Sequence, residues 1–193
     1  MKNLFHKLKV FFLTVLGDIK IFKFPFFLIY DPSSFRVKGF HTRQAMKLLQ
    51  PGDIILRRYR CYLDGLFIPG KYSHSGIYAG NGEIIHAVAE GVSKIDVIDF
   101  LRCDGFCILR QNDIDLAHLA VQYAESIVGK KGQYDFDFID DNDSWYCHEL
   151  SALAYPTCHI EKKEARILGI KVAPRYLASS FLENENFFKV LER

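Results

Sequence analysis

The chain has 193 residues, of which 49% are hydrophobic, enough for one packed domain and too few for two. Its five cysteines are an odd number without a Cys-x-x-Cys pair, which argues against a disulfide framework or a zinc ribbon. Residues 1–47 hold nine Lys and Arg against two Asp, a net +7, so the total of +2 leaves −5 for the rest. An acidic main part is unsuited to nucleic acid, and we expect no nucleic-acid partner.

Residues 1–46 are predicted to form a basic, aromatic-rich N-terminal arm, and residues 47–193 the main domain. The apolar run from Val10 to Gly17 is far shorter than the roughly 20 residues of a membrane-spanning helix, and no Ala-x-Ala-like cleavage site follows it. Lysines alternate with large apolar residues through residue 30, which favours an interfacial segment on an anionic membrane surface. An arm folded onto the domain or onto a second copy is the alternative, and the oligomeric state stays open.

Past this arm, helical and strand patterns alternate. Residues 42–49 indicate a short helix ended by Pro51-Gly52, and two apolar runs separated by Gly80-Asn81-Gly82 indicate a hairpin. Strands are expected at 53–58, 106–110, 167–172 and 187–191, and helices at 113–128, from Cys147 onward, and from Pro174 to 182. The pattern predicts an α+β fold with an antiparallel sheet packed against helices.

Cys147 follows the acidic stretch YDFDFIDDNDSWY and opens the apolar segment CHELSALAY. Candidate caps upstream (Asn142, Asp143 and Ser144) place it in the first helical turn, where unpaired N–H groups and the helix dipole favour a thiolate. We therefore interpret Cys147 as a nucleophile. The alternative is a buried structural cysteine, since free cysteines are commonly core residues, and a base elsewhere must decide.

His74 and His86 are the strongest candidates for that base, because the two arms of the predicted hairpin carry one each. A two-residue Asn81-Gly82 turn would point them to opposite faces of the sheet. A three-residue loop with a bulge would set Gly76 opposite His86 and place both histidines on one face, within reach of each other. On one face, His74 takes the thiol proton and holds the thiolate as an imidazolium, and His86 orients it.

A metal or cofactor is not expected. A site made of Cys147, His148, Cys158 and His159 would match no familiar ligand spacing. The acidic cluster between Asp135 and Asp143 lacks the glycine and the terminal glutamate of a calcium loop. The default interpretation of that cluster is a solvated loop.

Five segments, in this order, resemble the YiiX/YaeF-like permuted papain-fold amidases, relatives of the NlpC-type cell-wall peptidases and of lecithin:retinol acyltransferase. They are LQPGDIIL (49–56), YSHSGIYAG (72–80), IIHA (84–87), GQYDFDF (132–138) and WYCHEL (145–150). The resemblance covers roughly residues 47–191 and implies a circularly permuted papain-like fold. It assigns the nucleophile to Cys147, the base to His74 and the orienter to position 86, with Tyr134 beside the site and Tyr72 as a further substrate-binding candidate.

One departure concerns the orienter. YiiX-like members commonly carry glutamate there, whereas His86 is similar to the acyltransferase and to many NlpC-type members. A neutral histidine orients His74 but does not stabilise an imidazolium as a carboxylate does.

The expected function is a cysteine-dependent hydrolase that cleaves a peptide, cell-wall or lipid-linked amide through a thioester acyl-enzyme. Lipid acyl transfer, or a phospholipase-like reaction, is the alternative, and a non-catalytic, membrane-associated binding module is the second. A membrane-associated, cytoplasmic, or secreted or periplasmic location stays open.

Overall fold

The structure is a computed structural model that describes residues 35–59, 68–130, 144–167 and 169–193, together with Leu8, Phe11 and the backbone of 19–23 and 26–30. The chain divides into two compact units, residues 1–35 and 36–193. Helix α2 (Gly39–Leu48) therefore belongs to the larger unit, whereas the sequence placed the division between residues 46 and 47.

The smaller unit contains a β-hairpin. Strand β1 (Ile19–Lys23) pairs antiparallel with β2 (Phe26–Tyr30), with Ile19 opposite Tyr30 and Lys23 opposite Phe26. Leu8 and Phe11 have helical backbone and are exposed. Among the described residues, no helix has the length and apolar character to cross a membrane. The membrane contact expected for residues 1–30 stays a prediction.

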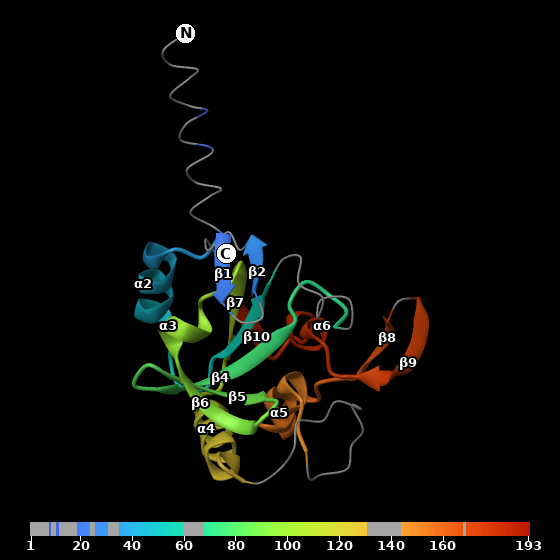
Figure 1. Ribbon diagram of the computed structural model, residues 1–193. Coiled ribbons are helices and arrows are strands. Elements are labelled where there is room, and N and C mark those ends of the chain that lie inside the picture. The colour runs from blue at the N-terminus through green and yellow to red at the C-terminus, as the bar shows by residue number, and fades with distance from the viewer. Residues whose placement is uncertain are drawn as a thin grey trace. The chain divides into compact units, whose positions relative to one another are not determined.

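The larger unit is built on a six-stranded antiparallel sheet with the strand order β10-β7-β3-β4-β5-β6 (Figure 1). Its strands are β3 (Ile54–Arg58), β4 (His74–Gly80), β5 (Glu83–Val88), β6 (Gly91–Asp96), β7 (Gly105–Gln111) and β10 (Phe187–Glu192). The β4–β5 hairpin and the strands at β3, β7 and β10 confirm the sequence prediction. The expected α+β class with an antiparallel sheet is confirmed as well.

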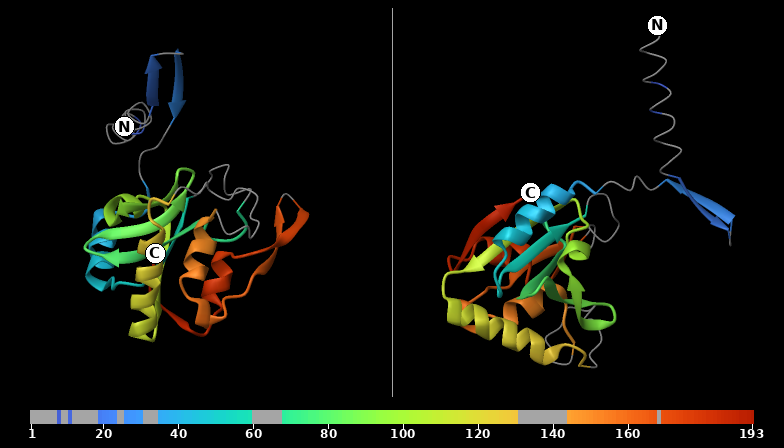
Figure 2. Two further views of the ribbon diagram at one scale, coloured as in Figure 1. Left: turned by 90° about the horizontal axis from the view of Figure 1, so that it is seen from below. Right: turned by 90° about the vertical axis from the view of Figure 1, so that its left-hand side faces the viewer.

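Helices cover both faces of this sheet (Figure 2). One core joins the sheet to α4 (Ile114–Ile127), α5 (Cys147–Leu153) and α6 (Ala178–Leu182), and the other joins it to α2 and α3 (Val97–Phe100). Side chains alternate along each strand, so Ile54 enters the first core and Ile55 the second. The alternation lets β4 present adjacent residues to two different environments.

The segment after α5 differs from the expectation. A short 3₁₀ helix, η2 (Pro156–Cys158), is followed by a hairpin of β8 (Lys163–Ile167) and β9 (Ile170–Arg175) in place of one strand at 167–172. The helix expected from Pro174 to Leu182 is present as α6 but begins only at Ala178, because Pro174 lies in β9. Its register partner falls where the pairing with β8 is irregular, between Lys163 and Ala165, and a proline is tolerated at such a place because it has no N–H to donate.

The segment at Gly52 anchors the start of β3. Gly52 has φ 92, and a Cβ there would lie 2.6 Å from the Cβ of Ala117 on α4. The carboxylate of buried Asp53 accepts hydrogen bonds from Arg110 Nε at 2.7 Å and Nη2 at 2.8 Å. The LQPGDIIL motif therefore has a structural role, because it fixes the start of β3 against β7 and α4.

Candidate active site

The register of the β4–β5 hairpin decides where the two histidines point. Ile77 lies opposite Ile85 and Tyr78 opposite Ile84, so Gly76 faces His86, as the one-face alternative requires. Gly80 pairs with Glu83, which leaves a two-residue turn at Asn81 and Gly82 with φ values of 52 and 81. The extra residue of the bulge lies inside β4, between Tyr78 and Gly80, and not in a three-residue loop.

The two histidine rings meet on that face. His74 Nε2 lies 2.9 Å from His86 Nδ1, and the rings are nearly perpendicular at 86°. The predicted proximity of the two histidines is confirmed. When His74 Nε2 carries the hydrogen and donates it to His86, Nδ1 of His74 has the lone pair of a base.

Phe100 of α3 packs against both imidazoles. Its ring centroid lies 5.7 Å from that of His74 and 5.7 Å from that of His86. Gly76 makes this packing feasible, because a Cβ there would lie 3.1 Å from Phe100 Cε2 and 2.6 Å from Ile84 Cγ2. Phe100 and Gly76 thus fix the orientation of the pair from the side of α3.

Arg57 brings a positive charge to the same cluster. It is the register partner of His74 on β3, and its guanidinium carbon lies 4.3 Å from the centre of the Phe100 ring. Nη1 donates a hydrogen bond to the Phe100 carbonyl oxygen at 3.2 Å. The sequence analysis missed Arg57, although the strand segment DIILRR beside the hairpin carries it.

The pKa values of both histidines are lowered. Burial, then the charge of Arg57 and the neighbouring His86 and His148, keep the pKa of His74 well below its ordinary value. Burial and Arg57 lower the pKa of His86 to about 4. Burial and Arg57 therefore favour the neutral form of both imidazoles, and the imidazolium–thiolate pair expected from the sequence stays a prediction.

Cys147 is the first residue of α5 and is 2% exposed. Its Sγ lies 3.9 Å from the carbonyl oxygen of Ser73, and its own carbonyl oxygen accepts a hydrogen bond from Ser75 Oγ at 2.8 Å. The cysteine therefore lies against the residues on both sides of His74. The N-cap position is held by Tyr146 and not by Ser144, and the Tyr146 backbone N–H donates to Glu149 Oε2 at 3.4 Å; Asn142 and Asp143 lie outside the described residues.

A buried polar network holds the first turn of α5. Ser75 Oγ lies 2.9 Å from Ser151 Oγ and 2.9 Å from His148 Nδ1, and Ser151 Oγ donates to the Cys147 carbonyl at 3.2 Å. Burial lowers the pKa of His148 to about 4, so this imidazole is also neutral. The sequence analysis missed the network, because its members come from distant segments and each is ordinary in isolation.

The two tyrosines named from the resemblance have different outcomes. Tyr72 is fully buried, and its hydroxyl donates to Glu192 Oε1 at 2.7 Å. Burial and this carboxylate raise the pKa of Tyr72, so the residue is a core member and its expected substrate-binding role is not supported. Tyr134 and the acidic stretch from Asp135 to Asp143 lie outside the described residues.

The other ligand-type residues do not gather. No group of three or more His, Cys, Asp or Glu within the described ranges is placed to hold a metal ion. Cys158 instead accepts a hydrogen bond from Gln111 Nε2 at 2.9 Å, and His118 is exposed on α4.

Comparisons with known proteins agree with this architecture. Residues 48–190 match the family model described as permuted papain-like amidase enzyme, YaeF/YiiX, C92 family. The crystal structure of the metalloprotein yiiX from Escherichia coli O157:H7 superposes with a TM-score of 0.60 at 17% identity, covering 76% of this chain and 98% of that one. A search of curated proteins found no match. With the histidine-bearing hairpin ahead of the cysteine helix in the chain, these findings show that the protein belongs to the permuted papain-like amidases of the YaeF/YiiX family, a family of cysteine peptidases.

Proposed function

We propose that the protein cleaves an amide bond through a thioester acyl-enzyme, with Cys147 as nucleophile, His74 as general base and His86 as its orienter. One observation carries the proposal: the 2.9 Å bond from His74 to His86 lies beside a cysteine that contacts both Ser73 and Ser75. A nucleophile, a base and a group that orients the base are the three parts that thiol catalysis requires.

In the proposed reaction, Cys147 Sγ attacks the carbonyl carbon while its proton moves to His74 Nδ1. The tetrahedral intermediate collapses, the C–N bond breaks, and the same proton passes to the leaving nitrogen. Water then attacks the thioester and gives a proton to His74, which returns it to the departing thiolate. Throughout, His74 Nε2 keeps its hydrogen bond to His86.

The lowered pKa of His74 determines how protons move in the proposed reaction. A base that is neutral at rest forms its imidazolium only while the thiol reacts, and an imidazolium beside Arg57 is a strong acid. Strong acidity assists the step in which an amine leaves, because that nitrogen must gain a proton. Protonation of the leaving group is therefore the step that Arg57 favours. Tyr134 stays the proposed partner for the oxyanion.

The test uses 4-nitrophenyl acetate, an activated ester that reports acylation directly. We expect a burst of nitrophenolate equal to the amount of enzyme and an acetyl group on the Cys147 peptide by mass mapping. Cys147→Ala abolishes both, while His118→Ala, an exposed change on α4, leaves both intact. A burst that survives Cys147→Ala, or an acetyl group elsewhere, contradicts the assignment.

Lipid acyl transfer is the second candidate, and His86 favours it, because a histidine at the orienter position is similar to the acyltransferase relatives. The two candidates differ in what they release. Incubation with peptide amides and with phosphatidylcholine, followed by assays for free amine and for free fatty acid, separates them. We expect amine release, and fatty acid or acylated amine as the main product supports the second candidate.

A further inference from the structure

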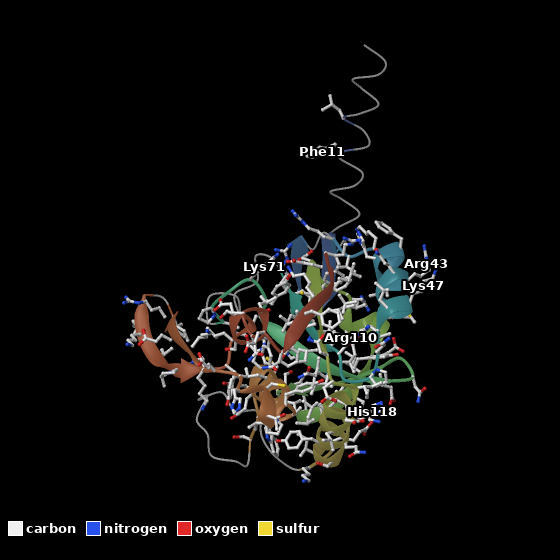
Figure 3. All side chains as sticks on the ribbon, turned by 180° about the vertical axis from the view of Figure 1, so that it is seen from behind. Phe11, Arg43, Lys47, Lys71, Arg110 and His118 are labelled. Carbon is white, nitrogen blue, oxygen red and sulfur yellow. The ribbon has the colours of Figure 1, made fainter. Side chains whose placement is uncertain are left out.

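The outer side of α2 combines exposed apolar and basic residues. Phe40 is 58% exposed and Met46 45% exposed, and Arg43 and Lys47 on the same helix are exposed as well. Figure 3 shows Arg43 and Lys47 next to each other on the side of α2 that faces away from the sheet. Together these four residues are called the α2 face below.

The four residues are exposed because α2 packs on the domain through its opposite side. Ala45 is fully buried in the core between α2, α3 and the sheet, so the helix is fixed through its inner side. A surface helix of a globular protein normally turns polar residues outward. Here a phenylalanine and a methionine point outward instead, which is the pattern of a surface with a partner.

Basic side chains outnumber acidic ones around the α2 face. Residues 36–52 contain four basic residues (Arg36, Lys38, Arg43 and Lys47) and no acidic one. Arg193 adds a fifth basic side chain, whose Nη2 donates to Gln44 Oε1 at 3.0 Å. At the approach to the helix, Asp104 accepts a hydrogen bond from the Arg36 backbone N–H at 3.2 Å. A partner that complements this face is anionic.

We propose that the α2 face docks on an anionic phospholipid bilayer. Phe40 and Met46 enter the boundary between headgroups and acyl chains, and Arg43 and Lys47 contact lipid phosphates. Interfacial amphipathic helices bind in the same way: the burial of apolar area and the attraction to anionic lipid both contribute to the binding free energy.

Charge argues against two other possible partners of the α2 face, the N-terminal arm and a second copy of the chain. The arm, residues 1–35, contains five Lys against two Asp, so it repels the basic α2 face. Two copies of the chain that meet through their α2 faces repel each other for the same reason.

The test is co-sedimentation of the full chain with vesicles of phosphatidylcholine alone and of phosphatidylcholine with one quarter phosphatidylglycerol. We expect binding only to the anionic vesicles, weakening as salt is raised. Each basic residue near such a surface strengthens binding, so Arg43→Ala with Lys47→Ala lowers the partition coefficient by roughly tenfold or more. Phe40→Ala with Met46→Ala lowers it as well.

Matched controls change the same residue types elsewhere. Lys130→Ala with Arg166→Ala removes two exposed charges, and Ile114→Ala with Ile170→Ala removes two side chains that are 67% and 70% exposed. Both controls bind as wild type does. The arm is unchanged in every variant, so differences report on α2.

A direct readout places α2 in the bilayer. The emission of Phe40→Trp shifts to the blue on anionic vesicles and is quenched by brominated lipid, while that of Ile170→Trp is not. Three results overturn the proposal: wild type that ignores anionic vesicles, α2 variants that bind as the controls do, or an oligomer that Phe40→Ala with Met46→Ala dissociates while vesicle binding stays constant. The last result assigns the face to a second copy.

Discussion

Two polar clusters lie beside the start of β4, and they differ in charge and burial. One consists of Ser75, Ser151 and His148, which are buried and bonded to one another and to the Cys147 carbonyl. The other consists of His74, His86 and Arg57 around the Phe100 ring, and it contains a cation and a base. Because side chains alternate along a strand, two neighbouring residues of β4 have different roles. Ser75 holds the cysteine helix, and His74, one residue earlier, performs the proposed proton transfer.

The largest expected effect is a loss of acylation rate in His74→Ala without a comparable loss of stability. His74→Ala removes the general base, and we expect the acylation rate with 4-nitrophenyl acetate to fall by roughly 10²- to 10⁴-fold. The free energy of unfolding in urea should fall by only about 1–3 kcal/mol, the cost of leaving buried His86 without its hydrogen-bond partner. Equal losses of rate and stability would instead give His74 a mainly structural role.

The pH dependence of stability should involve both clusters. Near pH 6.5 an unfolded histidine takes up a proton, whereas folded His86 and His148, with pKa values of about 4, do not. The unfolded state therefore binds more protons as the pH falls from 6.5 to about 4, and stability is lost over that window. Between pH 7 and pH 5 we expect a loss of about 2 kcal/mol for each histidine, measured by urea unfolding.

Substitution of each histidine separates the two contributions. His86→Gln and His148→Gln should each remove about 2 kcal/mol of that pH dependence, and the part that remains in the double variant comes from His74, whose pKa is also lowered. A free energy of unfolding that is flat between pH 7 and pH 5 in wild type contradicts the neutral, buried state of both rings.

Ser75→Ala tests the structural cluster. It removes the hydroxyl that bonds Cys147, Ser151 and His148, and leaves buried polar groups with fewer partners, so we expect a loss of about 1–3 kcal/mol in the free energy of unfolding. The measurement is urea unfolding at pH 7, with Ser126→Ala on the exposed side of α4 as the control. Unchanged stability would mean that the network does not hold α5.

The smallest expected effect comes from Arg57→Gln. Removal of the guanidinium removes one of the causes that lower the pKa of His74 and His86, so both values rise. The base then takes up a proton at higher pH. The acid limb of the pH–rate profile for acylation therefore shifts to higher pH, by up to about one pH unit for this partly exposed charge. A pH profile that does not move would remove Arg57 from the electrostatics of the site.

The sequence predicted the parts of this site that depend on local pattern. Gly80-Asn81-Gly82 indicated the hairpin, and the two alternative registers gave opposite outcomes for His74 and His86. The position of the bulge chose between them, and it lies within β4 at a residue that no turn signal marks. The sequence therefore predicted two alternative registers for the β4–β5 hairpin, and packing of the folded sheet against both cores selected one of them.

Other features depend on contacts between distant segments. The Ser75–His148 bond joins residues 73 positions apart, and Arg57 is distinguished only by its place beside His74 and Phe100. Pro174 was read as a helix start because proline is common there, but the β8–β9 pairing accommodates it. On α4 the large apolar Leu119 is 57% exposed, while the small Ala120 and Ala124 are the residues buried in the core with the sheet.

The most direct test of the central claim is the rate at which iodoacetamide labels each cysteine at pH 7, in wild type and in His74→Ala, resolved by peptide mass mapping. Burial raises the pKa of Cys103 and of Cys107 to about 11, so these thiols should react slowly. The account predicts that Cys147 is labelled faster than both and that His74→Ala slows it specifically. Labelling of Cys147 no faster than that of Cys103, with no effect of His74→Ala, would contradict it.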